Sequence, residues 1–127
     1  METKRQKQVA ELIKRHFSMV LQKEGYTIYG NEVMVTVTQV RMSPDLSLAK
    51  IYLSIYNTEN KQAVMMVMEE NLYRLRQSLV ARIRKHVRRI PDINLYMDET
   101  IDEMYRLDAL FKRLHRENQM GDSDDRD

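Results

Sequence analysis

The sequence contains no cysteine and no tryptophan, and it has only three glycines and two prolines. Without cysteine it has no disulfide framework and no thiolate metal site, a composition that fits a reducing compartment. The glycines stand at positions 25, 30 and 121, too far apart for a phosphate-binding loop or a dinucleotide-binding fingerprint. The sequence therefore excludes disulfide-stabilised domains, proteins with thiolate metal sites, and nucleotide-binding proteins that use either of these glycine motifs.

Long apolar runs are also missing. The N-terminal stretch METKRQKQVAELIKRHF scatters apolar residues among Lys and Arg, whereas a signal peptide or membrane span needs a continuous apolar segment. A length of 127 residues suits one domain. We expect a cytoplasmic, monomeric protein without membrane association, made of one domain over residues 1–115 and a disordered acidic tail over residues 116–127.

The charge is unevenly distributed. The last eleven residues hold five acids and one base, which leaves 20 basic and 14 acidic residues, a net charge of +6, in residues 1–116. A basic body favours a polyanionic partner, because clustered Lys and Arg displace counterions from phosphates. The composition alone does not separate DNA from RNA.

Hydrophobic periodicity predicts the elements. Apolar residues at three-and-four spacing indicate a helix from Lys4 to Lys23, which Gly25 ends. β-branched, alternating segments predict strands over Val33–Met42 and Ala49–Tyr56, and the turn formers in Ser43–Ser47 join them as a hairpin.

After the loop Asn57–Asn60, a helical segment runs toward Pro91 with a break near Glu70 to Leu72. DINLYMD then gives a third strand, followed by a last helix through about His115 in which Asp98 and Glu99 cap the start. The predicted fold class is α+β, a three-stranded sheet covered on one face by helices.

The strongest candidate site is the basic segment Arg74–Arg89, which has seven Lys or Arg residues and no acid. On a helical wheel its cations lie outside the apolar sector, and no neighbour along the helix neutralises them. Arg76 is the exception, inside that sector, and is not counted as a ligand. The candidates for RNA binding are Arg74, Arg82, Arg84, Lys85, Arg88 and Arg89, with Lys4, Arg5 and Lys7 as an extension of the surface. An ordinary solvated face remains the alternative.

Other chemistry has weaker signals. Tyr52 and Tyr56 share a strand face and either stack on bases or, as we favour, pack across strands. His16, His86 and His115 are scattered without metal-ligand spacing, so we expect no metal, no cofactor and no catalytic residue. We interpret His16 as a histidine at the edge of the core. We expect Met65, Met66 and Met68 to fill gaps in the core.

The segment VTVTQVRMSPDLSLAKIYLSIY, Val35–Tyr56, closely resembles the strand, turn and strand signature of bacterial ribosome-binding factor A, including V-T-V-T, V-R-x-S-P-D-L-S and A-K-x-Y. LRQSLVARIRKHVRRIPDINLYMDETID resembles the family's basic helix, its Arg-Arg-aliphatic-Pro junction and the following strand. The resemblance covers roughly residues 4–111. Asn71, Leu72 and Tyr73 stand where the family commonly has Ala-x-Gly, and Lys85 with His86 looks like an insertion that lengthens the basic helix.

The resemblance implies a K-homology domain of the second type, without the Gly-x-x-Gly loop of related RNA-binding modules. It also implies a non-enzymatic factor that binds the immature small (30S) ribosomal subunit and assists late maturation of 16S-type RNA. Our hypothesis is that the basic helix contacts RNA backbone at helical junctions. Two alternatives stay open: a module that docks the same face on an acidic protein, and a binder of free single-stranded nucleic acid.

Overall fold

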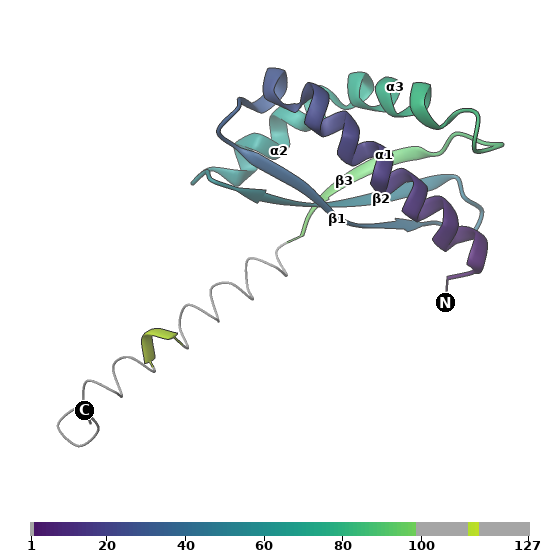
Figure 1. Ribbon diagram of the computed structural model, residues 1–127, viewed down its shortest axis with the longest axis horizontal. Helices are drawn as coiled ribbons and strands as arrows, with labels where there is room; N and C mark the ends of the chain where they lie inside the picture. Colours follow the sequence, from purple (N-terminus) through teal and green to yellow (C-terminus); the bar gives the residue numbers. More distant parts are fainter. Residues whose placement is uncertain (1, 99–111, 115–127) are drawn as a thin grey trace. The chain divides into compact units, whose positions relative to one another are not determined.

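The computed structural model describes residues 2–98 and 112–114, and its elements are labelled in Figure 1. Residues up to Met97 form one packed unit. Its elements follow in the order α1 (Lys4–Tyr29), β1 (Met34–Met42), β2 (Leu48–Tyr56), α2 (Lys61–Glu70), α3 (Leu72–Ile83) and β3 (Asp92–Met97). Lys112–Leu114 are helical. Most of the predicted last helix and the predicted tail lie outside the described residues.

The three strands form one sheet in the order β1-β2-β3. β1 and β2 are antiparallel, as the predicted hairpin requires, whereas β3 pairs parallel to β2 with Asp92 beside Leu48. Figure 1 shows α1, α2 and α3 on the same side of this sheet. The predicted α+β class, with helices covering one face of a three-stranded sheet, is confirmed.

The central strand β2 supplies the floor of the core. Its alternate residues Ala49, Ile51, Leu53 and Ile55 are each 0% exposed, as strand alternation predicts when one face is covered. Phe17 and Ile13 of α1 are also fully buried, because the apolar stripe of that helix lies against the sheet. No helix among the described residues combines the length and the apolar character needed to cross a bilayer.

β1 contains an irregularity that alternation alone does not predict. Its register against β2 shifts between Val37 and Gln39, so Thr38 is the extra residue of a β-bulge. The Thr38 hydroxyl donates to the carbonyl oxygen of Tyr52 at 3.2 Å. Val37 before the bulge and Val40 after it both face the core, although their spacing is odd.

Gly25 does not end α1, so that prediction is wrong. The helix continues to Tyr29, and Gly30 at φ 89° is its cap, donating its amide to the Tyr26 carbonyl. Gly25 is buried inside the helix, where an added Cβ would meet the ring of Tyr29. A helical glycine costs about 0.5–1 kcal/mol relative to alanine, which the packing of the last turn against the core outweighs.

The predicted break in the second helical segment is confirmed at Asn71, which separates α2 from α3. Its backbone lies at φ −104° and ψ 15°, and its side-chain amide donates to the carbonyl of Val67 at 2.8 Å. Asn60 caps the start of α2 by accepting from the amide of Ala63. An asparagine therefore ends one helix and begins the next without a glycine.

The methionines of α2 provide a test of the core. Met68 is 0% exposed and Met66 is 63% exposed, so the prediction that both fill the core is wrong for Met66.

Met68→Ala should lower the free energy of unfolding by about 2–5 kcal/mol, because it leaves a cavity. Met66→Ala, the same change on the same helix, should stay within about 0.5 kcal/mol. Urea denaturation followed by circular dichroism measures both; equal losses would contradict the packing.

Candidate nucleic-acid interface

The basic segment is divided between two structures, because α3 ends at Ile83 and the chain continues as a turn and an irregular loop. The prediction of a helix through Arg89, lengthened by Lys85 and His86, is therefore wrong. The amide of His86 donates to the Ile83 carbonyl at 2.8 Å and closes the turn. Val87 and Pro91 are buried, so the chain leaves the helix to place both against the core before β3 begins.

Two of the predicted RNA ligands already bind α1. The Arg74 guanidinium pairs with Glu24 at 2.9 Å and donates to the hydroxyl of Thr27. A hydrogen bond from Ser78, together with Arg74, holds the pKa of Glu24 below its usual value, although burial opposes this. Arg82 donates to Nδ1 of His16 at 3.3 Å and to the sulfur of Met19. The charge of Arg74 is thus neutralised from another helix, which the pattern along α3 does not reveal.

Four other cations lie in the segment Arg84–Ile90, which we name the basic loop. Their side chains are exposed, and none of the four makes an ion pair or a side-chain hydrogen bond with any residue that the structure describes. These residues are Arg84, Lys85, Arg88 and Arg89. Unpaired cations gathered on a few residues attract polyanions more strongly than the same charges in ion pairs.

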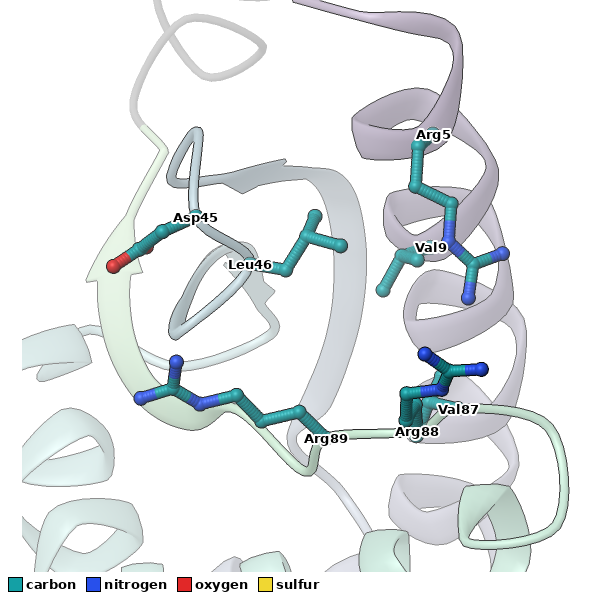
Figure 2. Close-up of a pocket in the computed structure, with 7 residues that line it drawn as sticks. All are labelled: Arg5, Val9, Asp45, Leu46, Val87, Arg88 and Arg89. Atoms are coloured by element: carbon teal, nitrogen blue, oxygen red, sulfur yellow. The ribbon is translucent and has the colours of Figure 1, made fainter.

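The basic loop forms one wall of a cavity of about 380 Å³. α1 contributes a second wall with Arg5 and Val9, and the β1–β2 turn contributes a third with Asp45 and Leu46. Figure 2 shows the guanidinium groups of Arg5 and Arg88 on the α1 side, and the Arg89 guanidinium on the side of Asp45. The structure therefore brings together one N-terminal candidate and two loop candidates.

Hydrogen bonds between elements fix these walls. The buried Gln6 side chain donates to the Met42 carbonyl at 3.0 Å and, with Thr3, forms a capping box at the start of α1. The amide of Asp92 donates to the Ser47 carbonyl at 2.9 Å, which ties the end of the basic loop to the hairpin turn. Arg5 and Arg88 are thus each held within a few residues of an anchored position.

Asp45 organises the turn. Its Oδ1 accepts from the hydroxyls of Ser47 and Ser43 and from the Ser47 amide, and these bonds, in that order, lower its pKa to about 2. The nearby charge of Arg89 adds to this effect. Sequence reasoning identified Ser43–Ser47 as a turn but missed its place in the cavity, because no pattern along the chain shows which loops meet at one end of a sheet.

The remaining N-terminal candidates face elsewhere. Lys4 and Lys7 line a different hollow, together with Glu11, Leu12 and Arg15 of the same helix. Arg5 is therefore the N-terminal cation that the structure places with the basic loop. Arg76, which we did not count as a ligand, is partly buried and pairs with Asp92 at 3.6 Å.

The tyrosines of the sheet face pack on one another. Tyr52 of β2 and Tyr96 of β3 are directly paired in register, with ring centroids 5.3 Å apart and planes inclined by 26°. This is the cross-strand packing favoured from the sequence for Tyr52. The partner, Tyr96, was not identified from the sequence, because the parallel pairing of β3 was not predicted.

The histidines confirm one sequence interpretation. His16 lies half-buried at the edge of the core, stacks on His86 with centroids 6.1 Å apart, and receives the Arg82 hydrogen bond. Burial, followed by the charges of Arg82, Arg15 and His86, lowers its pKa from 6.5. Within the described part of the chain, no group of three or more potential ligands is placed to hold a metal ion.

The pKa of His16 yields a prediction. Because the fold favours the neutral imidazole, the His16 contribution to stability should be complete above pH 6.5 and lost as the pH falls through the lowered pKa. An NMR titration of its ring protons should give a midpoint below 6.5. Arg82→Gln should raise that midpoint, and Arg15→Gln should raise it by less. A midpoint at or above 6.5 in the unaltered chain would refute this account.

Comparison with known proteins adds family evidence to this geometry. The family model described as ribosome-binding factor A matches residues 5–111. Ribosome-binding factor A of Cytophaga hutchinsonii is 41% identical over 114 residues, covering 90% of this chain and 85% of that protein. The homologous protein of Chlorobaculum tepidum is 34% identical over 105 residues, covering 82% of this chain and 85% of its own length.

A solved structure has the same fold. The crystal structure of ribosome-binding factor A from Thermus thermophilus matches with a TM-score of 0.59 at 20% identity, covering 72% of this chain and 94% of that one. A homology model of the Thermus thermophilus protein, fitted into a cryo-electron microscopy map of its 30S complex, matches with a TM-score of 0.57 at 22% identity, covering 70% of this chain and 90% of that one. The family match spans the signature strands, the cavity walls and the basic loop, and the chain belongs to the ribosome-binding factor A family.

Proposed function

We propose that this chain binds the small (30S) ribosomal subunit during its maturation, and that the basic loop and Arg5 make the main contacts with 16S ribosomal RNA. The Thermus thermophilus relative is described in a 30S complex, and membership of the same family supports the same partner here. The family consists of assembly factors that are not enzymes. We place its action in the cytoplasm, where small subunits are assembled.

The observation that carries the residue assignment is the unequal pairing of the cations. Arg74 and Arg82 are held by α1, whereas Arg84, Lys85, Arg88 and Arg89 form no ion pair and no side-chain hydrogen bond with the described residues. Binding of RNA releases counterions from phosphates, and the gain is largest for cations that need not first break an ion pair. The basic loop is therefore the part of the predicted surface that is best prepared for RNA.

The geometry favours recognition of backbone shape. The guanidinium groups of Arg88 and Arg89 lie on opposite sides of the cavity (Figure 2), and phosphates of a folded RNA are likewise spread in space. The planar guanidinium of arginine also forms paired hydrogen bonds with phosphate oxygens. We infer that binding of phosphates positions the protein at a junction of RNA helices, in agreement with our hypothesis from the sequence.

Replacing Arg84 and Lys85 together by glutamine should weaken binding to purified small subunits by at least about tenfold and flatten its salt dependence, because two cations that bind phosphates are removed. Sucrose-gradient co-sedimentation at several salt concentrations measures both effects. The matched control is Lys23→Gln with Lys50→Gln, which removes the same charge from exposed positions outside the basic loop and should change binding little.

If both double variants weakened binding to small subunits equally, the assignment of the basic loop would be wrong and only a general effect of charge would remain. A chain that fails to co-sediment with small subunits at any salt concentration would overturn the partner. A complex that survives complete nuclease digestion would favour an acidic protein as the partner.

A further inference from the structure

The cavity beside the basic loop has an excess of positive charge. Arg5, Arg88 and Arg89 line it, and Asp45 is the one acid among its lining residues. That carboxylate already accepts three hydrogen bonds within its own turn. The guanidinium groups of Arg5 and Arg88 lie on the same side of the cavity, away from Asp45 (Figure 2). Two cations drawn together in this way repel each other unless an anion lies between them.

The same cavity has an apolar floor. Val9 and Val87 are 4% and 9% exposed, and the side chains of Leu46 and Val9 point toward each other in Figure 2. This surface is continuous with the core, because Leu46 packs on the cluster to which both valines belong. An inorganic anion makes no use of an apolar floor, whereas a flat ring does.

Leu46 has an unusual backbone. Its φ of 63° lies in the left-handed region, where glycine or asparagine is accommodated with less strain than a leucine. The side chain remains only half-buried, so core packing alone does not account for a large apolar residue there. Strained residues of this kind are concentrated at ligand sites.

We propose that this cavity binds one unpaired nucleotide of the partner RNA, with its phosphate between Arg5 and Arg88 and its base against Leu46, Val9 and Val87. The proposal rests on the proposed function and adds a nucleotide pocket to a surface otherwise defined by its charge. A nucleotide has one anionic group and one flat ring, and the cavity provides a cationic side and an apolar floor. On the hairpin side the charge of Asp45 offsets that of Arg89, so the side of Arg5 and Arg88 attracts phosphate more strongly, and this difference sets the orientation.

The cavity is separate from the break between helices α2 and α3. Asn71, between α2 and α3, contributes nothing to its walls, which come from the start of α1, the hairpin turn and the basic loop. These walls are tied together by the Gln6 to Met42 and Asp92 to Ser47 hydrogen bonds. The pocket is therefore formed before any ligand arrives, which reduces the entropy lost on binding.

The test compares two strands that carry the same phosphates. Fluorescence anisotropy should show the chain binding a ten-residue oligouridylate at least about tenfold more tightly than a ten-residue abasic ribose-phosphate strand, because stacking of a base adds to phosphate binding. Leu46→Asn, which suits the left-handed backbone, should remove most of this preference and leave binding of the abasic strand unchanged.

Charge variants separate phosphate binding from base binding. Arg5→Gln with Arg88→Gln should weaken binding of both strands and lower the salt slope by about 0.7 for each phosphate that the chain no longer neutralises. Lys23→Gln with Lys50→Gln, the matched control, should leave both affinities nearly unchanged. Thermal unfolding of each variant checks that it is folded.

Equal affinity of the unaltered chain for the two strands would overturn the proposal, as would a folded Leu46→Asn chain that keeps the preference. So would equally tight binding of a ten-residue polyglutamate, which has no base for the floor. If Leu46→Asn does not fold, methyl NMR of the unaltered chain decides the question. The Leu46, Val9 and Val87 signals must shift with oligouridylate and not with the abasic strand. Subunit binding that survives a failure here would leave the proposed function standing.

Discussion

The parallel pairing of β3 with β2 is the constraint on which the rest of the unit depends. A parallel neighbour must begin at the same end of the sheet as β2, so the chain has to return there after β2 has ended. α2 and α3 carry the chain back to that end, and the break at Asn71 lets α3 follow a different direction from α2. The basic loop is the final part of this connection, where helix gives way to strand. Its cations are exposed because the chain closes the core here with Val87 and Ile90 of the loop and with Pro91 just after it.

The same constraint sorts the charges. Residues on α3 lie against α1, so Arg74 and Arg82 find acceptors there and serve to hold the two helices together. Beyond Ile83 the chain still contacts α1 through His86, but Arg84, Lys85, Arg88 and Arg89 form no ion pair with the described residues, and their charges remain available. The basic segment that looks uniform along the chain thus has two parts: Arg74 and Arg82 bind α1, and the cations beyond Ile83 form no ion pair with the described residues. The boundary between them is the end of a helix.

Most of the fold was predictable from residues whose environment is local. The hairpin was predictable because alternation in β2 and the Pro-Asp turn both act over a few residues. The break at Asn71 was predictable because the apolar stripe changes face there. Four features depended on distant partners and were missed: the continuation of α1 through Gly25, the bulge at Thr38, the end of α3 at Ile83 and the parallel pairing of β3.

The candidate site shows the same division. Spacing along the chain located the cations of Arg84, Lys85, Arg88 and Arg89, and the resemblance at Val35–Tyr56 supplied the kind of RNA. Neither of these placed Arg5 with Arg88 or brought Leu46 to the same cavity, because the start of α1, the hairpin turn and the basic loop meet only in three dimensions. The helical wheel was also extended through Arg89, although α3 ends at Ile83, so the directions it gave for Arg84 to Arg89 do not apply.

The bulge in β1 has a consequence for how this chain tolerates change. Val37 and Val40 both face inward only because one extra residue reverses the parity of the strand between them. If all nine residues paired regularly, without the bulge, Arg41 would turn toward the core and Val40 toward the outer face. Loss of Thr38 alone would keep both valines inward, because Gln39 and Val40 already pair with Tyr52 and Ile51. A change that straightened β1 without removing a residue would therefore misplace every side chain on one side of the bulge.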